Sequence, residues 1–118
     1  MLEINYEFRK GILFIRLSGV LNKNTVDKLQ NEVTDMIKDN GIRNVVFNVS
    51  ELNVIDIRGI NSLIYNYELC KNNQGKSLLC GLNNSLVRHR IENSRLLKYM
   101  NETSDELSAF NMINLWGE

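Results

Sequence analysis

Three side chains of the sequence, Cys70, Cys80 and His89, belong to types that often act as nucleophiles or metal ligands. The two cysteines are too few and too badly spaced for a metal site, and no histidine flanks either of them. Because free cysteine is among the most frequently buried residue types, we expect two reduced core thiols, with a disulfide as the less favoured alternative. His89 lies between two arginines, which disfavour both its protonation and cation binding. It is expected at the surface.

Motifs of known catalytic sites are missing from this sequence. It contains no Gly-rich phosphate loop, no nucleophile elbow, and no His and Asp paired near a Ser or Cys. The carboxylates are scattered over polar segments, where solvation accounts for them. A cluster of cations in residues 88–98 is better explained as a solvated face than as a patch for an acidic partner. We therefore predict a protein that is not an enzyme and that needs no cofactor or metal ion.

The segment from residue 53 to residue 60 departs from the local rules for a helix start. Asp56 is placed to cap a helix by accepting a hydrogen bond from the backbone N–H of Arg58 or Gly59. Arg58 puts a cation in the first turn, where the helix dipole favours anions by roughly 0.3–1 kcal/mol. Gly59 either allows another backbone to approach closely or relieves crowding at the helix start. Departures of this kind concentrate at functional sites.

Composition indicates the class of protein. The chain has 118 residues, of which 43% are hydrophobic, and this predicts a single domain over residues 1–118. It carries 14 basic and 14 acidic side chains, so there is no net charge to attract nucleic acid. Apolar runs end well short of the roughly 20 residues that a membrane span needs, so no membrane insertion is expected. The first residues lack the pattern of a signal peptide, and we expect a cytoplasmic location. Nothing in the sequence indicates the oligomeric state.

Alternating apolar residues in 2–8 and an apolar run in 12–17 predict an antiparallel hairpin. A 3.6-residue apolar period predicts a helix from Thr25 to Asn40. Residues 43–49 are rich in β-branched side chains and predict a buried strand, followed by a loop at residues 50–53. A second amphipathic helix is expected from Ile57 to Gln74.

Predicted strands and helices also alternate in the second half of the chain. Residues 77–80 predict a fourth strand, and Asn84 starts a short helix with an apolar set of Leu86, Val87 and Ile91. Residues 96–100 are a weaker candidate for a fifth strand. Thr103 and Glu106 have the spacing of a capping box before a last helix, whose apolar positions are Leu107, Phe110, Ile113 and Trp116.

This order of elements predicts an α/β fold with an open sheet of four to five strands and about four helices. The sheet should be mostly parallel, with an antiparallel N-terminal strand, because each strand–helix–strand crossover returns the chain in the same direction. Four side chains on apolar stripes or central strands are predicted to be buried: Val33, Val46, Leu63 and Leu79.

Four stretches of the sequence, taken in order, match one known pattern. They are Ile15-Arg-Leu-Ser-Gly-Val-Leu-Asn22 with Thr25, residues 42–52, Asp56-Ile-Arg-Gly-Ile60, and residues 78–82 with 85–90. In this order and spacing the chain resembles the STAS family, and within it the bacterial anti-sigma factor antagonists of sporulation and stress response. The position of Asn22 is often Asp in that family, and residues 56–60 occupy the place of its Asp-Ser-Ser-Gly-Leu motif.

The resemblance implies a function in partner binding. Relatives of this type bind an anti-sigma factor with a GHKL-type kinase fold, which frees a sigma factor, and the kinase ends the association by phosphorylating the second Ser of the motif. Here Ile57 and Arg58 replace the two serines, so the usual phosphoacceptor is missing. Ser62, one turn further on, is a substitute candidate, although an ordinary helix serine is favoured. The implied partner-binding and regulatory residues are Asn22, Asp56, Ile57, Arg58, Gly59 and Ser62.

Two other functions stay open. One is a STAS module in a stress-signalling scaffold or as the soluble partner of a membrane transport complex. The other is a small-molecule or nucleotide site at the mouth of the sheet, since open α/β sheets hold ligands beyond their strand ends. No phosphate-cradling glycines support the second alternative.

Overall fold

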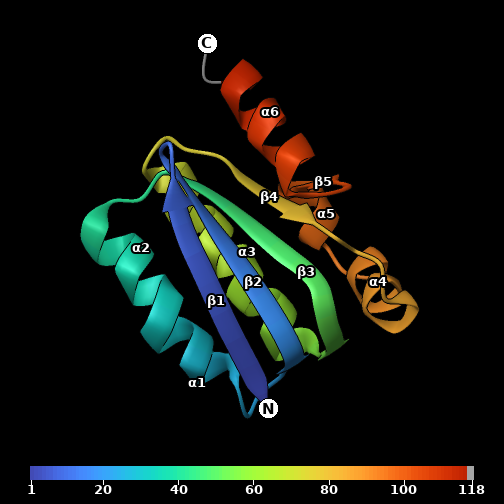
Figure 1. The fold of residues 1–118 in the computed structure, drawn as a ribbon. Coiled ribbons are helices and arrows are strands. Elements are labelled where there is room, and N and C mark those ends of the chain that lie inside the picture. The colour runs from blue at the N-terminus through green and yellow to red at the C-terminus, as the bar shows by residue number, and fades with distance from the viewer. Residues whose placement is uncertain (117–118) are drawn as a thin grey trace.

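Five strands form one sheet whose spatial order follows the order of the sequence (Figure 1). The computed structural model describes residues 1–116. Strand β1 is antiparallel to β2, and the pairs β2–β3, β3–β4 and β4–β5 are parallel, which confirms the predicted sheet. The strands are β1 (Leu2–Arg9), β2 (Ile12–Leu21), β3 (Asn44–Ile55), β4 (Ser77–Cys80) and β5 (Asn101–Thr103).

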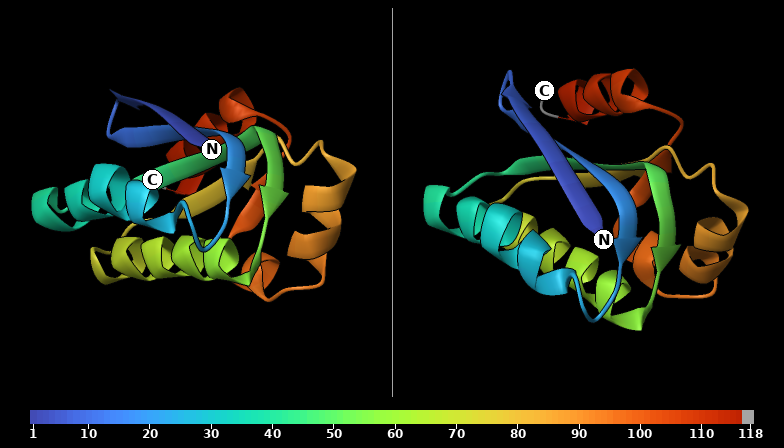
Figure 2. Two further views of the ribbon diagram at one scale, coloured as in Figure 1. Left: turned by 90° about the horizontal axis from the view of Figure 1, so that it is seen from below. Right: turned by 60° about the horizontal axis from the view of Figure 1, so that its bottom comes forward.

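Helices cover the two faces of the sheet unequally. Within residues 1–116, helix α6 packs on one face, and the remaining helices lie on the other (Figure 2). The first helical segment is continuous and contains a π-helical stretch, η1, between its α-helical ends. The helices are α1 (Val26–Leu29), η1 (Gln30–Thr34), α2 (Asp35–Asn40), α3 (Ile57–Asn72), α4 (Ser85–Glu92), α5 (Leu96–Tyr99) and α6 (Glu106–Trp116).

The larger hydrophobic core lies between the sheet and the many-helix face, and a smaller one lies under α6. The four side chains predicted to be buried, Val33, Val46, Leu63 and Leu79, are completely inaccessible. Both cysteines are buried free thiols, as predicted. Burial raises the pKa of Cys70 to about 12 and that of Cys80 to about 12, so neither thiol ionises near neutral pH.

Strand β3 is longer than predicted, and the expected loop at residues 50–53 is part of it. The extra residues pair with the second half of β2, where Val20 faces Val54 and Leu21 faces Ile55. The register shifts between Arg16 and Ser18 and again between Gly19 and Val20, and at each shift β3 contains one residue more than β2. The polar residues at 50–53 have low strand propensity, so the sequence did not predict a strand there. Pairing with β2 stabilises this part of β3.

The predicted strand at residues 96–100 is wrong. Residues 96–99 form helix α5, and the fifth strand follows at β5. Ser94 Oγ accepts a hydrogen bond from the N–H of Leu96 at 3.1 Å, and the N–H of Met100 closes the turn onto the Leu96 carbonyl at 2.9 Å. Both Leu96 and Met100 are buried in the core. A short apolar run of this kind can be buried by one helical turn as well as by a strand, so the sequence pattern does not distinguish the two.

The predicted capping box at Thr103 and Glu106 is also wrong. Asp105 takes the capping role, since its Oδ1 accepts from the N–H of Ser108 at 2.8 Å and this bond lowers the pKa of Asp105. In α6 Ile113 is buried as expected, whereas Leu107 is exposed. The side chain of Trp116 lies outside the described part of the chain.

Glu106 instead anchors α6 to the sheet. Its two carboxylate oxygens accept hydrogen bonds from Arg16 Nε and Nη2, each at 2.8 Å, and one of them also accepts from Asn48 Nδ2 at 2.8 Å. The hydrogen bonds from Arg16 lower the pKa of Glu106 against the opposing effect of burial. This paired geometry is the strong form of an ion pair, and it holds α6 on this face of the sheet.

We predict that Glu106→Gln lowers the free energy of unfolding by about 1–2 kcal/mol at neutral pH. A carboxylate with a depressed folded pKa stabilises the fold above its unfolded pKa of about 4.3, and this contribution is lost as pH falls through the folded pKa. The difference between wild type and variant in urea denaturation should therefore shrink from pH 6 to pH 3. Glu92→Gln, at an exposed ion pair with Arg88, is the control and should change stability little. A difference that is constant over this pH range would contradict the assignment.

Candidate functional site

The carboxylate of Asp56 joins the end of β2, the end of β3 and the start of α3. Its Oδ1 accepts from the N–H of Gly59 at 2.9 Å and caps α3, as predicted. Its Oδ2 accepts from the N–H of Lys23 at 3.0 Å, in the loop after β2. The backbone N–H of Asp56 donates to the carbonyl of Leu21 at 3.2 Å. The loop after β2 is therefore fixed to the junction of β3 and α3, 33 residues further along the chain, at one residue.

Gly59 is required by a close approach of the chain to itself. A Cβ atom added there would lie 2.6 Å from the carbonyl oxygen of Leu21 and 2.9 Å from the side chains of Leu21 and Ile55. Any side chain would therefore push α3 away from the strand ends. Of the two predicted explanations for this glycine, the structure supports the close approach of a backbone, and that backbone is β2.

Asn22 shapes the loop between β2 and α1. Its Oδ1 accepts from the N–H of Asn24 at 2.9 Å, and its own N–H donates to Thr25 Oγ1 at 2.9 Å. The Thr25 hydroxyl in turn donates to the carbonyl of Val20 at 2.9 Å. Asn22 is thus a turn residue that presents the Lys23 N–H to Asp56, and it belongs to the same assembly as the helix start.

Arg58 and Ser62 lie together on the side of α3 that faces the first helical segment. Both line a hollow of about 260 Å³ that is closed on the opposite side by residues of α1 and η1, including Gln30 and Thr34. Arg58 is exposed, whereas the Ser62 hydroxyl is partly buried and donates to the carbonyl of Gly59 at 2.7 Å. The π-helical stretch borders this hollow, and such stretches occur frequently at functional sites.

Ile57 lies on the other side of the α3 start, beside α4. Its side chain is 60% exposed, and those of Val54 and Leu86 are 45% and 70% exposed. Ile57 lines a hollow of about 480 Å³, Val54 and Leu86 line another of about 160 Å³, and His89 and Arg90 line both. We call the residues Val54, Ile57, Leu86, His89 and Arg90 the α3–α4 surface. Large apolar side chains grouped at the surface are typical of a protein-binding site.

The six residues predicted from the sequence therefore divide into two groups. Asn22, Asp56 and Gly59 hold the helix start in place, while Ile57, Arg58 and Ser62 are presented by it. Sequence reasoning missed Leu86, which was assigned to the apolar stripe of its helix. Only Val87 and Ile91 of that helix are buried, and their four-residue spacing leaves Leu86 about 100° away around the axis. That spacing could have identified Leu86 as exposed.

Within residues 1–116 no group of three or more His, Cys, Asp or Glu side chains is placed to hold a metal ion. No helix in this part of the chain is long and apolar enough to cross a bilayer. His89 is exposed, as predicted.

Comparison with known families matches residues 3–109 to the STAS domain. The chain belongs to the STAS domain family. An anti-sigma F factor antagonist from Paenibacillus polymyxa is 27% identical over 108 residues, which are 92% of each chain. This similarity includes the helix start described above, where the STAS domain of this chain places Arg58.

Two solved structures share the fold. The Bacillus cell fate determinant SpoIIAA in its phosphorylated form has a TM-score of 0.71 at 17% identity, over 93% of this chain and 99% of that one. A sulfate transporter family protein from Wolinella succinogenes has a TM-score of 0.74 at 17% identity, over 92% of this chain and 89% of that one. The same STAS architecture thus occurs in a phosphorylated regulator and in a transporter family.

We predict that Asp56→Ala lowers the free energy of unfolding by about 1–2 kcal/mol, because the cap at Gly59 and the bond to Lys23 are both lost. Asp56→Asn keeps an acceptor oxygen of the same size and should cost less. Urea denaturation of the three proteins measures the difference. If Asp56→Ala is as stable as the wild type, the proposed role of Asp56 in joining the three segments is wrong.

Proposed function

We propose that this chain is an anti-sigma factor antagonist that binds an anti-sigma factor with a GHKL-type kinase fold and acts in transcription regulation without the usual phosphorylation switch. The observation that carries the proposal is the exposure of Ile57, at the helix start where the family motif lies, together with that of Leu86 on α4. The antagonist from Paenibacillus polymyxa supports the choice of partner. The proposed action is binding and not catalysis.

The interface would consist of the α3–α4 surface together with Arg58. It combines exposed apolar side chains with the cations Arg58 and Arg90, so it fits a partner that presents apolar side chains and carboxylates. Burying exposed apolar side chains would supply the affinity. The cations would steer the association and make it sensitive to salt.

Arg58 changes how such a complex is regulated. Arginine has no hydroxyl for a serine kinase to phosphorylate, and its charge is opposite to that of a phosphoserine. Arg58 therefore cannot act as the phosphorylation switch, and it does not imitate the phosphorylated form that relatives use for release. We infer that the complex is constitutive. Ser62 is a poor substitute acceptor, because its hydroxyl is partly buried and bonded to the Gly59 carbonyl.

A second candidate function is a STAS module in a stress-signalling scaffold or beside a membrane transport complex. The fold shared with the Wolinella succinogenes sulfate transporter family protein favours the transport alternative. Affinity purification of the protein from its native cell separates the candidates, since recovery of transport components without an anti-sigma factor would support the second.

We predict that Ile57→Asp weakens binding to the anti-sigma factor at least tenfold, about 1.4 kcal/mol, because it places a carboxylate among the apolar side chains of the interface. Leu107→Asp is the matched control, since Leu107 is 69% exposed but lies on α6, on the opposite face. Isothermal titration against the purified anti-sigma factor measures both dissociation constants. Equal weakening by the two variants, or no binding by the wild type, would contradict the proposal.

The constitutive complex gives a separate prediction. Wild-type protein should keep its affinity when ATP is added, whereas Arg58→Ser should become phosphorylated and released. Arg58→Asp should bind at least tenfold more weakly than wild type, with or without ATP. Mass spectrometry and the same titrations report both effects. Phosphorylation and release of the wild type would show that the switch is intact, and Ser62→Ala would then test whether Ser62 is the acceptor.

A further inference from the structure

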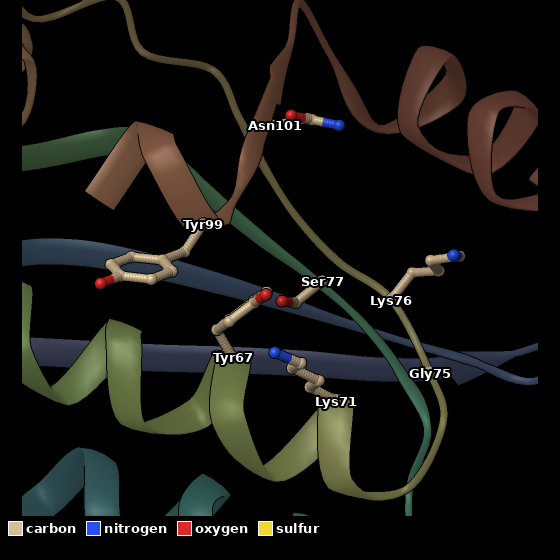
Figure 3. Close-up of a pocket in the computed structure, with 7 residues that line it drawn as sticks. All are labelled: Tyr67, Lys71, Gly75, Lys76, Ser77, Tyr99 and Asn101. Carbon is tan, nitrogen blue, oxygen red and sulfur yellow. The ribbon is translucent and has the colours of Figure 1, made fainter. Parts of the chain in front are cut away.

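A hollow of about 520 Å³ lies at the C-terminal half of α3, far from the α3–α4 surface. Its walls come from α3, from the turn before β4 and the first residue of β4, from the end of α5, and from the start of β5 (Figure 3). Arg58 and Lys71 are thirteen residues apart on α3, roughly 20 Å along the helix axis. The volume falls within the range of about 300–1,000 Å³ that is usual for small-molecule sites.

Polar groups of one chemical character gather in this hollow. Lys71 and Lys76 line it, and none of the lining residues is acidic. Figure 3 shows the Lys71 ammonium and the hydroxyls of Tyr67 and Ser77 directed toward the same part of the hollow. These groups are hydrogen-bond donors that together suit an anion.

The Ser77 hydroxyl is a polar group that the protein itself leaves unsatisfied. Ser77 is 6% exposed, and its Oγ has no hydrogen-bond partner in the described part of the chain. Buried hydroxyls of this kind are rare, because losing water without gaining a partner costs free energy. A molecule bound in the hollow would supply the missing partner after a small shift of the side chains around it.

Two aromatic rings form the wall beside these donors. Tyr67 and Tyr99 lie with ring centroids 5.4 Å apart at an interplanar angle of 44°. They offer an apolar surface for the body of a ligand whose anionic group faces Lys71. The hollow thus has a charged part and an aromatic part, as sites for small organic anions do.

The border of the hollow is preformed. The N–H of Gly75 donates to the Cys70 carbonyl at 2.8 Å, and the N–H of Lys76 donates to Asn44 Oδ1 at 3.0 Å. A Cβ atom at residue 75 would lie 1.7 Å from the carbonyl oxygen of Arg43, so the turn fits against β3 only as glycine. A rigid border lowers the entropy that binding must overcome.

We propose that this hollow binds a small organic anion, with a phosphate or carboxylate group held by Lys71 and the hydroxyls of Tyr67 and Ser77, and an aromatic or apolar body against Tyr67 and Tyr99. The site lies near the amino end of β4, opposite to the strand ends where the sequence suggested a ligand. It does not depend on the proposed partner.

Phenyl phosphate and benzoate are suitable probes, and neutral benzyl alcohol tests the need for charge. In NMR titrations of the full chain, a saturable shift of the amides of Tyr67, Lys71, Ser77 and Tyr99 is expected for at least one of the two anions, and none for benzyl alcohol. Comparing the two anions distinguishes a phosphate site from a carboxylate site.

Lys71→Gln should raise the dissociation constant at least tenfold, about 1.4 kcal/mol, without changing the thermal unfolding temperature. Lys38→Gln, on the exposed side of α2, is the matched control and should bind as the wild type does. Tyr67→Phe, which removes only the hydroxyl, should weaken binding as well. The proposal is overturned if neither anion gives a saturable shift, or if Lys71→Gln and Lys38→Gln weaken binding equally.

Discussion

The close contact between the first turn of α3 and the end of β2 is the constraint on which the interaction site depends. Gly59 permits the contact because no side chain separates it from the Leu21 carbonyl, and Asp56 fixes it with hydrogen bonds to Gly59 and Lys23. Each of these bonds satisfies a backbone donor that a helix start or a tight loop would otherwise leave without a partner. These hydrogen bonds therefore help to set the direction in which Ile57 and Arg58 project.

Helix α3 transmits this constraint along the molecule. Its buried stripe, which includes Leu63 and Cys70, packs into the larger core, so the helix cannot rotate without exposing apolar surface. Fixing the start of α3 therefore also fixes Tyr67 and Lys71, three and four turns further on. The α3–α4 surface and the proposed anion site consequently share one rigid element while drawing their other residues from different parts of the chain.

The sequence predicted those parts of the fold that are determined by local apolar patterns, such as the strand around Val46 and the helix around Leu63. It failed where a distant partner decides the structure. The end of β3 pairs with β2, and the Glu106 carboxylate binds Arg16 of β2 instead of capping its own helix. At the site, the helix start was predicted from the capping position of Asp56 and from the family motif. Leu86 was missed, although the four-residue spacing of Val87 and Ile91 places it off the buried side of α4.

Arg58 shows why a local departure from helix rules can be tolerated here. A cation in the first turn is unfavourable by roughly 0.3–1 kcal/mol, but the capping carboxylate of Asp56 lies at the same helix start and the guanidinium is exposed to solvent, which screens the repulsion. The fold thus does not require a small or neutral residue at this position. The stability of the fold therefore does not determine which charge residue 58 carries. An acidic surface on the proposed partner would make this mildly unfavourable residue a favourable contact in the complex.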